Sequence, residues 1–99
     1  MKLVVTEPAK LHLKEMHDYY KLKVSKRVAD KIKVGIIEKI KFVQEYPFAG
    51  QEEDLLLPLN LNHRRVVEGN YKIVYRIEEE TIFVTDIFDA RQNPDKMIG

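Results

Sequence analysis

The chain of 99 residues contains no cysteine, only four glycines and four prolines, and no long apolar run. Without cysteine it can form no disulfide, no reactive thiolate and no cysteine-based metal site. Its glycines are scattered, so no glycine-rich loop that could cradle a phosphate is present. No apolar run approaches the roughly 18 residues that a membrane-spanning helix needs. Disulfide-stabilised, thiol-dependent and P-loop proteins are therefore excluded, and no membrane span is expected.

The composition is that of one folded domain. Hydrophobic residues make up 44% of the chain and charged residues 33%, which excludes a disordered chain. The length fits a single domain over residues 1–99, in which nearly every apolar side chain must serve one core. Residues 1–9 lack the basic-then-apolar order of a secretory signal, so we expect a cytoplasmic protein.

Charge is nearly balanced overall but unevenly distributed along the chain. The formal net charge is +1. Residues 1–50 contain eleven basic and six acidic side chains, a balance of +5, whereas residues 51–99 contain six and ten, a balance of −4. Four of the six basic residues in the second half are arginines, whose rigid fork suits phosphates and carboxylates. This asymmetry indicates a charged partner.

The first half of the chain predicts a strand followed by two helices. A β-rich run over residues 2–6 ends where Thr6 can cap a helix. Ser25 begins a second helix with an apolar stripe at helical spacing. Pro47 disfavours helical geometry at the preceding residue, so this helix should end at Tyr46.

The second half predicts an antiparallel meander. Residues 48–62 form an irregular segment, interpreted as a loop with a partly buried apolar anchor. Period-two runs over residues 64–68 and 71–77 meet across Gly69-Asn70, which is typical of a type II′ hairpin, and a third strand covers residues 81–88. The order β-α-α-β-β-β predicts an α+β fold with the helical hairpin packed on one face of the sheet.

The two-residue loop also predicts which side chains share a face. Glu68 should oppose Tyr71, and the more apolar face of the hairpin should meet the helices. If Ile77 opposes Ile82, Asp86 falls on that core-facing side as well. The other face is expected to be open to solvent and cationic. It would carry His63, Arg65, Val67, Lys72, Val74 and Arg76.

These basic residues differ in their surroundings. Arg76 lies next to a run of three glutamates, which favours an ordinary surface ion pair. Arg65 and Lys72 have no obvious carboxylate nearby in the predicted register, which favours a functional role. His12 and His17 do not share a helix face and lack a third ligand, so neither a metal nor a cofactor is expected.

Residues 64–94 resemble a known family of toxins. The stretch reads RRVVEGNYKIVYRIEEETIFVTDIFDARQNP. It is similar to the C-terminal half of RelE/ParE superfamily toxins from bacterial type II toxin–antitoxin (plasmid stabilisation) modules. The upstream YPFAG also resembles the segment that ends the second helix in these toxins. The resemblance implies a growth inhibitor that a cognate antitoxin neutralises, and it leaves open a homodimer or a hetero-oligomer with the antitoxin.

The superfamily has two functional branches, and the resemblance places candidate residues for both. RelE-like members are ribosome-dependent mRNA endoribonucleases that use no metal, whereas ParE-like members inhibit DNA gyrase. By resemblance, Arg65, Lys72 and Arg91 would contact phosphate or the target, and they are catalytic only in a RelE-like enzyme. His63 is a candidate base. Arg64 and Arg76 are further candidates for target contact.

Two observations favour the ParE-like branch. RelE-like ribonucleases carry a tyrosine or histidine near the C-terminus, and Met97 at the aligned place cannot transfer a proton. A net charge of +1 also suits a ribosomal RNA partner poorly. We therefore expect an inhibitor of DNA gyrase. The alternatives are a RelE-like ribonuclease and a decayed, non-toxic binding module of the same fold.

Overall fold

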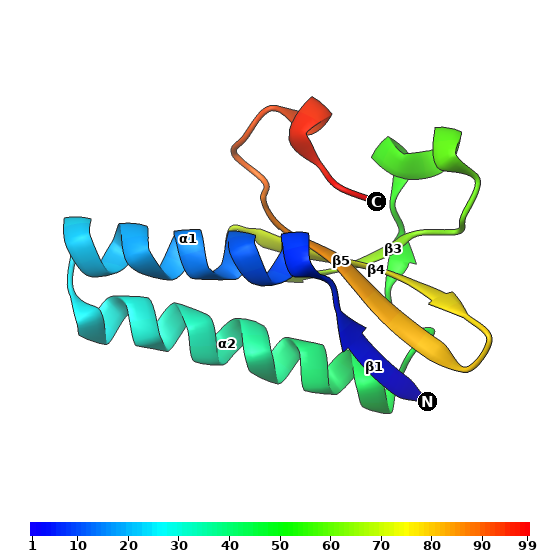
Figure 1. Cartoon of the computed structure of the whole chain (residues 1–99), viewed down its shortest axis with the longest axis horizontal. Coiled ribbons are helices and arrows are strands. Elements are labelled where there is room, and N and C mark those ends of the chain that lie inside the picture. Colours follow the sequence, from blue (N-terminus) through cyan, green and yellow to red (C-terminus); the bar gives the residue numbers. More distant parts are fainter.

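The computed structural model describes residues 1–99 and confirms the α+β fold (Figure 1). Strand β1 precedes a helical hairpin, and an antiparallel meander of three longer strands follows it. No helix combines the length and the apolar character needed to cross a membrane. The helices and strands are β1 (Lys2–Val5), α1 (Glu7–Lys23), α2 (Lys26–Glu45), β2 (Gln51–Glu52), η1 (Asp54–Leu59), β3 (Arg64–Glu68), β4 (Tyr71–Glu78), β5 (Thr81–Asp89) and η2 (Pro94–Lys96).

Both helices begin at the capping residues that the sequence predicts. The Thr6 hydroxyl accepts a hydrogen bond from the N–H of Ala9 at 3.4 Å, at the start of α1. The Ser25 hydroxyl accepts one from the N–H of Val28 at 3.1 Å, at the start of α2. Each bond satisfies an N–H group that has no partner within its helix. Helix α2 ends at Glu45, and Tyr46, where Pro47 predicts the end, is its C-terminal capping residue.

The five strands lie in the order β1-β5-β4-β3-β2. Strand β1 runs parallel to β5, and every other pair is antiparallel. Glu68 opposes Tyr71, so the predicted register of β3 and β4 is confirmed. Gly69 has a φ of 58°, the positive value that a type II′ loop requires at its first position.

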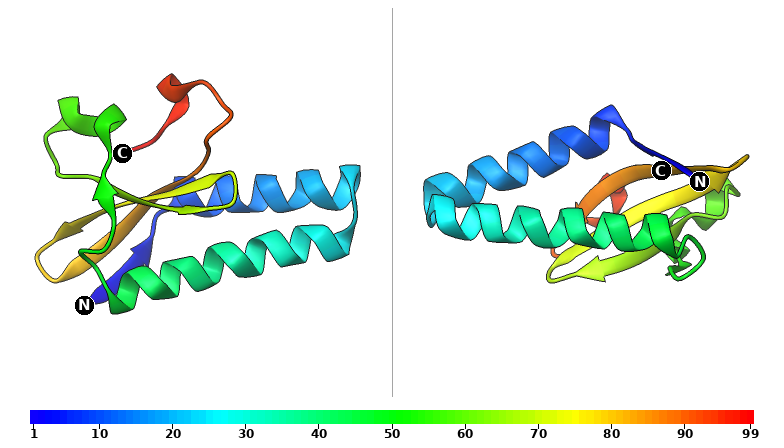
Figure 2. Two further views of the ribbon diagram at one scale, coloured as in Figure 1. Left: turned by 180° about the vertical axis from the view of Figure 1, so that it is seen from behind. Right: turned by 90° about the horizontal axis from the view of Figure 1, so that it is seen from below.

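The main core lies between the helical hairpin and one face of the sheet. Figure 2 shows both helices on the same side of the strands. Alternate residues of β4 face the helices, as the period of two predicts. The buried members of this core are Ala9, Met16, Ile36, Ile40, Val43, Tyr71, Ile73, Tyr75, Ile82, Val84 and Ile87.

The opposite face of the sheet is covered over much of its area. The prediction that it is open to solvent is wrong for His63 and Val74, which are buried, whereas Val67 is 57% exposed. Helix η1 and the C-terminal tail (residues 90–99) lie over it, on the side away from α1 and α2 (Figure 1). They bring Leu56 and Met97 onto Val74 and Phe88, and these four buried residues form a second core. Apolar side chains on both faces of β4 and β5 explain why the cover is needed, because exposed apolar surface is unfavourable.

A β-bulge changes the facing of the last strand. Tyr75 opposes Val84, but its neighbour Val74 opposes Asp86, so Thr85 is an additional residue on β5. Beyond a bulge the alternation of side chains shifts by one position. Asp86 therefore faces the C-terminal tail, and its predicted core-facing side is wrong.

The turn between β4 and β5 uses glutamates where other residues fit better. Glu79 and Glu80 have φ values of 47° and 62°, in the left-handed region that favours asparagine and glycine. We expect Glu79→Asn with Glu80→Gly to raise the free energy of unfolding by about 1–2 kcal/mol in chemical denaturation. Replacing both by glutamine removes the charges but keeps the strained backbone. This control should give little gain, and equal gains would contradict the backbone explanation.

Candidate functional site

Two predicted site residues meet on a carboxylate that the sequence did not reveal. We call Arg65 and Lys72, from adjacent strands, the cationic pair. Oε1 of Glu53 lies 3.0 Å from Nζ of Lys72, and its Oε2 lies 3.8 Å from Nη1 of Arg65. Oε2 also accepts a hydrogen bond from the N–H of Leu55 at 3.1 Å, so Glu53 caps η1. The prediction that no carboxylate lies near the cationic pair is wrong.

Arg65 is held further by the short edge strand β2. Its guanidinium donates to the backbone carbonyl of Glu52 and, at 3.3 Å, to the side-chain oxygen of Gln51. The side chains of Arg65 and Lys72 are 22% and 21% exposed, whereas that of Glu53 is 1% exposed. A carboxylate buried this deeply is stable only when paired. The cationic pair therefore has an internal anion, and the cluster of three keeps one positive charge.

The other two arginines of the meander, Arg64 and Arg76, each contact an aromatic ring and a nearby polar group. Arg64 donates to the carbonyl of Phe48 at 3.2 Å and lies over its ring, 5.4 Å from the centroid. Arg76 pairs with Glu78 at 2.5 Å, as its neighbouring glutamates predict, and lies 4.7 Å from the ring centroid of Phe83. Arginine stacking of this kind contributes modestly to stability.

His63 is buried rather than displayed on an open face. Both of its ring nitrogens are buried without a hydrogen-bond partner, and burial lowers the pKa of the imidazole. A Cβ placed on Gly99 would lie 3.1 Å from Nε2, so the C-terminal tail covers the ring. Met97, the residue at the place of the missing acid, is buried in the second core.

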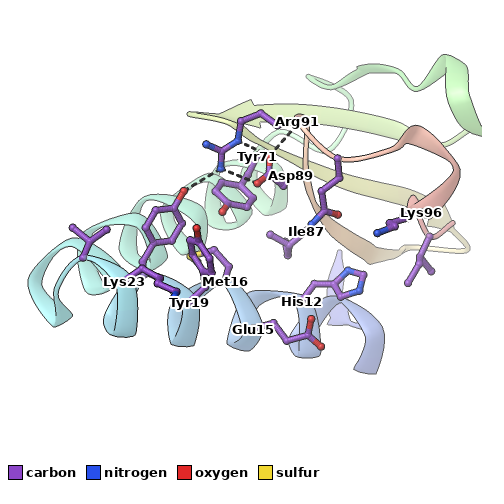
Figure 3. A pocket seen from close by; sticks show the side chains of 14 residues that line it. His12, Glu15, Met16, Tyr19, Lys23, Tyr71, Ile87, Asp89, Arg91 and Lys96 are labelled. Carbon is purple, nitrogen blue, oxygen red and sulfur yellow. Dashed lines mark hydrogen bonds and ion pairs between the residues drawn. The ribbon is translucent and has the colours of Figure 1, made fainter.

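A groove of about 1000 Å³ lies between α1, the end of β5 and the C-terminal tail (Figure 3). Arg91 lies at its edge and binds the Asp89 carboxylate through Nε at 2.9 Å and Nη2 at 2.8 Å. Nη2 also donates to the Tyr20 hydroxyl at 3.0 Å. The Arg91 guanidinium lowers the pKa of Asp89 and of Tyr20. Arg91 is thus bound to Asp89 and Tyr20 and not to Glu53. The lining residues are His12, Glu15, Met16, Tyr19, Tyr20, Lys23, Val24, Tyr71, Ile87, Asp89, Arg91, Gln92, Lys96 and Ile98.

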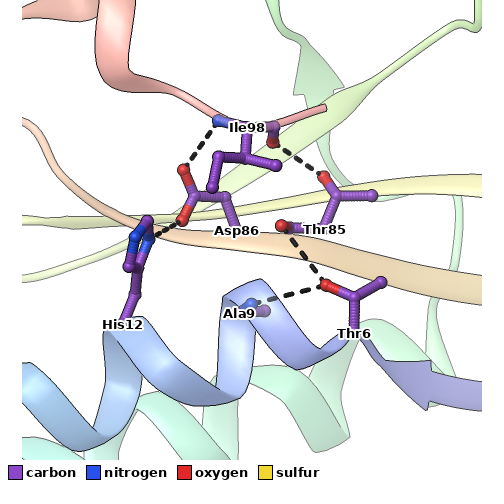
Figure 4. Close-up of polar contacts among 6 residues, drawn as sticks. All are labelled: Thr6, Ala9, His12, Thr85, Asp86 and Ile98. Atoms are coloured by element: carbon purple, nitrogen blue, oxygen red, sulfur yellow. Dashed lines mark hydrogen bonds and ion pairs between the residues drawn. The ribbon is translucent and has the colours of Figure 1, made fainter.

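Asp86 fastens the C-terminal tail beside this groove (Figure 4). Its side chain is 0% exposed; Oδ1 lies 2.6 Å from Nδ1 of His12, and Oδ2 accepts the N–H of Ile98 at 2.9 Å. The Thr85 hydroxyl donates to the carbonyl of Ile98 at 3.1 Å. The bulge at Thr85 turns Asp86 toward the tail, where its carboxylate binds His12 and the N–H of Ile98.

The predicted phosphate ligands Arg65, Lys72 and Arg91 do not share one set of partners. No group of three histidine or acidic side chains is placed to hold a metal ion. Arg65 and Lys72 therefore pair with Glu53, whereas Arg91 pairs with Asp89 and Tyr20.

Comparison with known proteins identifies one family. A model described as the ParE toxin of the type II toxin–antitoxin system parDE matches residues 3–94. No curated protein matches the chain. Among solved structures, the chain is similar to one of the chromosomal ParDE toxin–antitoxin system from P. aeruginosa, at 20% identity and a TM-score of 0.77. That match covers 90% of this chain and 95% of the other, and it agrees with the fold.

Proposed function

Because the chain belongs to the ParE toxin family of type II toxin–antitoxin systems, we propose that it inhibits growth by acting on DNA gyrase. It acts in the cytoplasm, and a cognate antitoxin neutralises it. The main alternative is cleavage of mRNA on the ribosome, since RelE-like ribonucleases have a similar fold. The choice between the two depends on whether these side chains can cleave RNA.

The internal pairing of the cations is the observation that carries this proposal. Metal-free cleavage of RNA needs cations around the scissile phosphate, a base at the 2′-hydroxyl and an acid at the leaving oxygen. Here the Glu53 carboxylate already binds Lys72 and Arg65. Met97, which aligns with the residue that would act as the acid, is buried in the second core. Both features oppose nuclease chemistry and support action by binding a protein target.

The charge distribution supports the same choice. Ribosomal RNA binds mainly through its phosphates, so affinity for it depends on exposed positive charge. The net charge is +1, and residues 51–99 are acidic overall. A protein target needs no such excess of positive charge.

Two assays on purified protein test the target. We expect the protein to block supercoiling of relaxed plasmid by gyrase and to leave mRNA on programmed ribosomes intact. Intact supercoiling together with cut mRNA would instead identify a RelE-like ribonuclease with Arg65, Lys72 and Arg91 as phosphate ligands. A folded protein with neither activity, and no effect on bacterial growth, would be a decayed binding module.

Co-expression tests the antitoxin. A short antitoxin-like reading frame should adjoin the gene, and its product should restore growth when both proteins are made together. Growth arrest that persists despite a stable complex would argue against neutralisation by that partner.

A further inference from the structure

The cationic pair and Glu53 together have the form of an occupied anion site. Arg65 lies on β3 and Lys72 on β4, and both side chains lie on the side away from the main core. They converge on one carboxylate, at 3.8 Å and 3.0 Å. Carboxylates and phosphodiesters accept hydrogen bonds from arginine and lysine in similar geometry. An arginine and a lysine brought together from adjacent strands could therefore hold a phosphate where the Glu53 carboxylate now lies.

Glu53 is delivered to this site by its own segment of the chain. It caps η1 by accepting the N–H of Leu55, and its own N–H donates to the carbonyl of His63 at 2.8 Å. One residue beyond Leu55, Leu56 is buried in the second core. The packing of η1 thus holds the carboxylate in place, and the cationic pair keeps only a partly exposed edge.

We propose that Glu53 is an internal substitute for a phosphodiester. By occupying the anion site of Arg65 and Lys72, it prevents this pair of cations from binding RNA. The inference goes beyond the proposed action on gyrase, because that action does not require an anion site at Arg65 and Lys72.

Glu53→Gln tests the proposal directly. Glutamine keeps the length of the side chain and an oxygen for the N–H of Leu55, but it removes the charge that holds the cationic pair. The probe is a short single-stranded RNA, and binding is followed by fluorescence anisotropy at several salt concentrations. One more free cation should steepen the plot of log affinity against log salt by about 0.7. If the affinities converge near 1 M salt, binding at 50 mM should be about eightfold tighter.

Two variants separate a local effect from a change in net charge. Glu52→Gln removes the same charge from an exposed neighbour of Glu53, and it should change the affinity by less than about twofold. Adding Lys72→Gln to Glu53→Gln should abolish the gain. Circular dichroism and urea unfolding establish that each variant is folded. A folded Glu53→Gln protein that binds RNA no better than the wild type, or no better than Glu52→Gln, would overturn the proposal.

A variant that keeps Glu53 provides a second measurement in case Glu53→Gln does not fold. Lys72→Gln alone should lower the weak RNA affinity by no more than about twofold, the effect of one unit of net charge that does not contact phosphate, because Glu53 already binds this lysine. A loss of about tenfold would show that Lys72 contacts phosphate despite Glu53, and would overturn the proposal. These measurements follow RNA binding and not gyrase inhibition. Their result would therefore remain valid even if the protein proved not to inhibit gyrase.

Discussion

Replacing His12 by alanine is expected to lower the free energy of unfolding by about 3–5 kcal/mol. The Asp86 carboxylate is 0% exposed and has two partners, Nδ1 of His12 at 2.6 Å and the N–H of Ile98 at 2.9 Å. Without His12 a buried negative charge keeps only one hydrogen bond. The cost is a large part of the roughly 5–15 kcal/mol by which small domains are stable. Urea unfolding followed by circular dichroism at neutral pH measures it.

The second histidine–aspartate pair provides the matched control. Nε2 of His17 lies 2.7 Å from Oδ1 of Asp30, a similar distance, but the Asp30 side chain is 44% exposed. His17→Ala should therefore cost less than about 1 kcal/mol, as surface ion pairs do. Combining His12→Ala with Asp86→Asn should recover part of the loss, since no buried charge then remains. Equal losses for the two histidines would contradict the role of burial.

The helices and the meander could be predicted because their signals are local. Thr6 and Ser25 are capping residues immediately before apolar periodicity, and Pro47 marks the end of α2 within a few residues. Gly69 sets the register of β3 against β4 because a two-residue loop leaves little choice of pairing. Each of these depends on neighbours in the sequence, and each is confirmed.

The site could be predicted only in part because its decisive contacts are not local. Glu53 lies in a segment without periodicity, so nothing in the sequence places its carboxylate on Lys72, 19 residues further along. The bulge at Thr85 shifts Asp86 to the other face, and a strict period of two cannot anticipate it. Arg65 and Lys72 are predicted correctly as cations of one sheet face, but the carboxylate that they share comes from the irregular segment.

Gly50→Ala is expected to lower the free energy of unfolding by about 2–3 kcal/mol, since overpacking a buried position forces its neighbours apart. Gly50 is buried, and an added Cβ would collide with the hydroxyl of Tyr75 and lie 2.9 Å from the carbonyl oxygen of Arg65. Gly35→Ala is the control, because there the Cβ would meet only the flexible end of Glu68, at 3.1 Å. In mid-helix this change should be neutral or stabilise by up to about 1 kcal/mol.

The Tyr75 hydroxyl explains why glycine is needed at position 50, and a double-mutant cycle tests it. The hydroxyl accepts the N–H of Gly50 at 2.9 Å and donates to the carbonyl of Pro47 at 2.8 Å, so Tyr75→Phe should cost about 1–3 kcal/mol. Removing the hydroxyl also makes room for the new methyl group. The double variant should therefore lose about 1–2 kcal/mol less than the two single losses combined. Strictly additive losses would mean that the Arg65 carbonyl alone limits the space. A coupled result would show that the Tyr75 hydroxyl limits the space at Gly50, the residue that precedes β2.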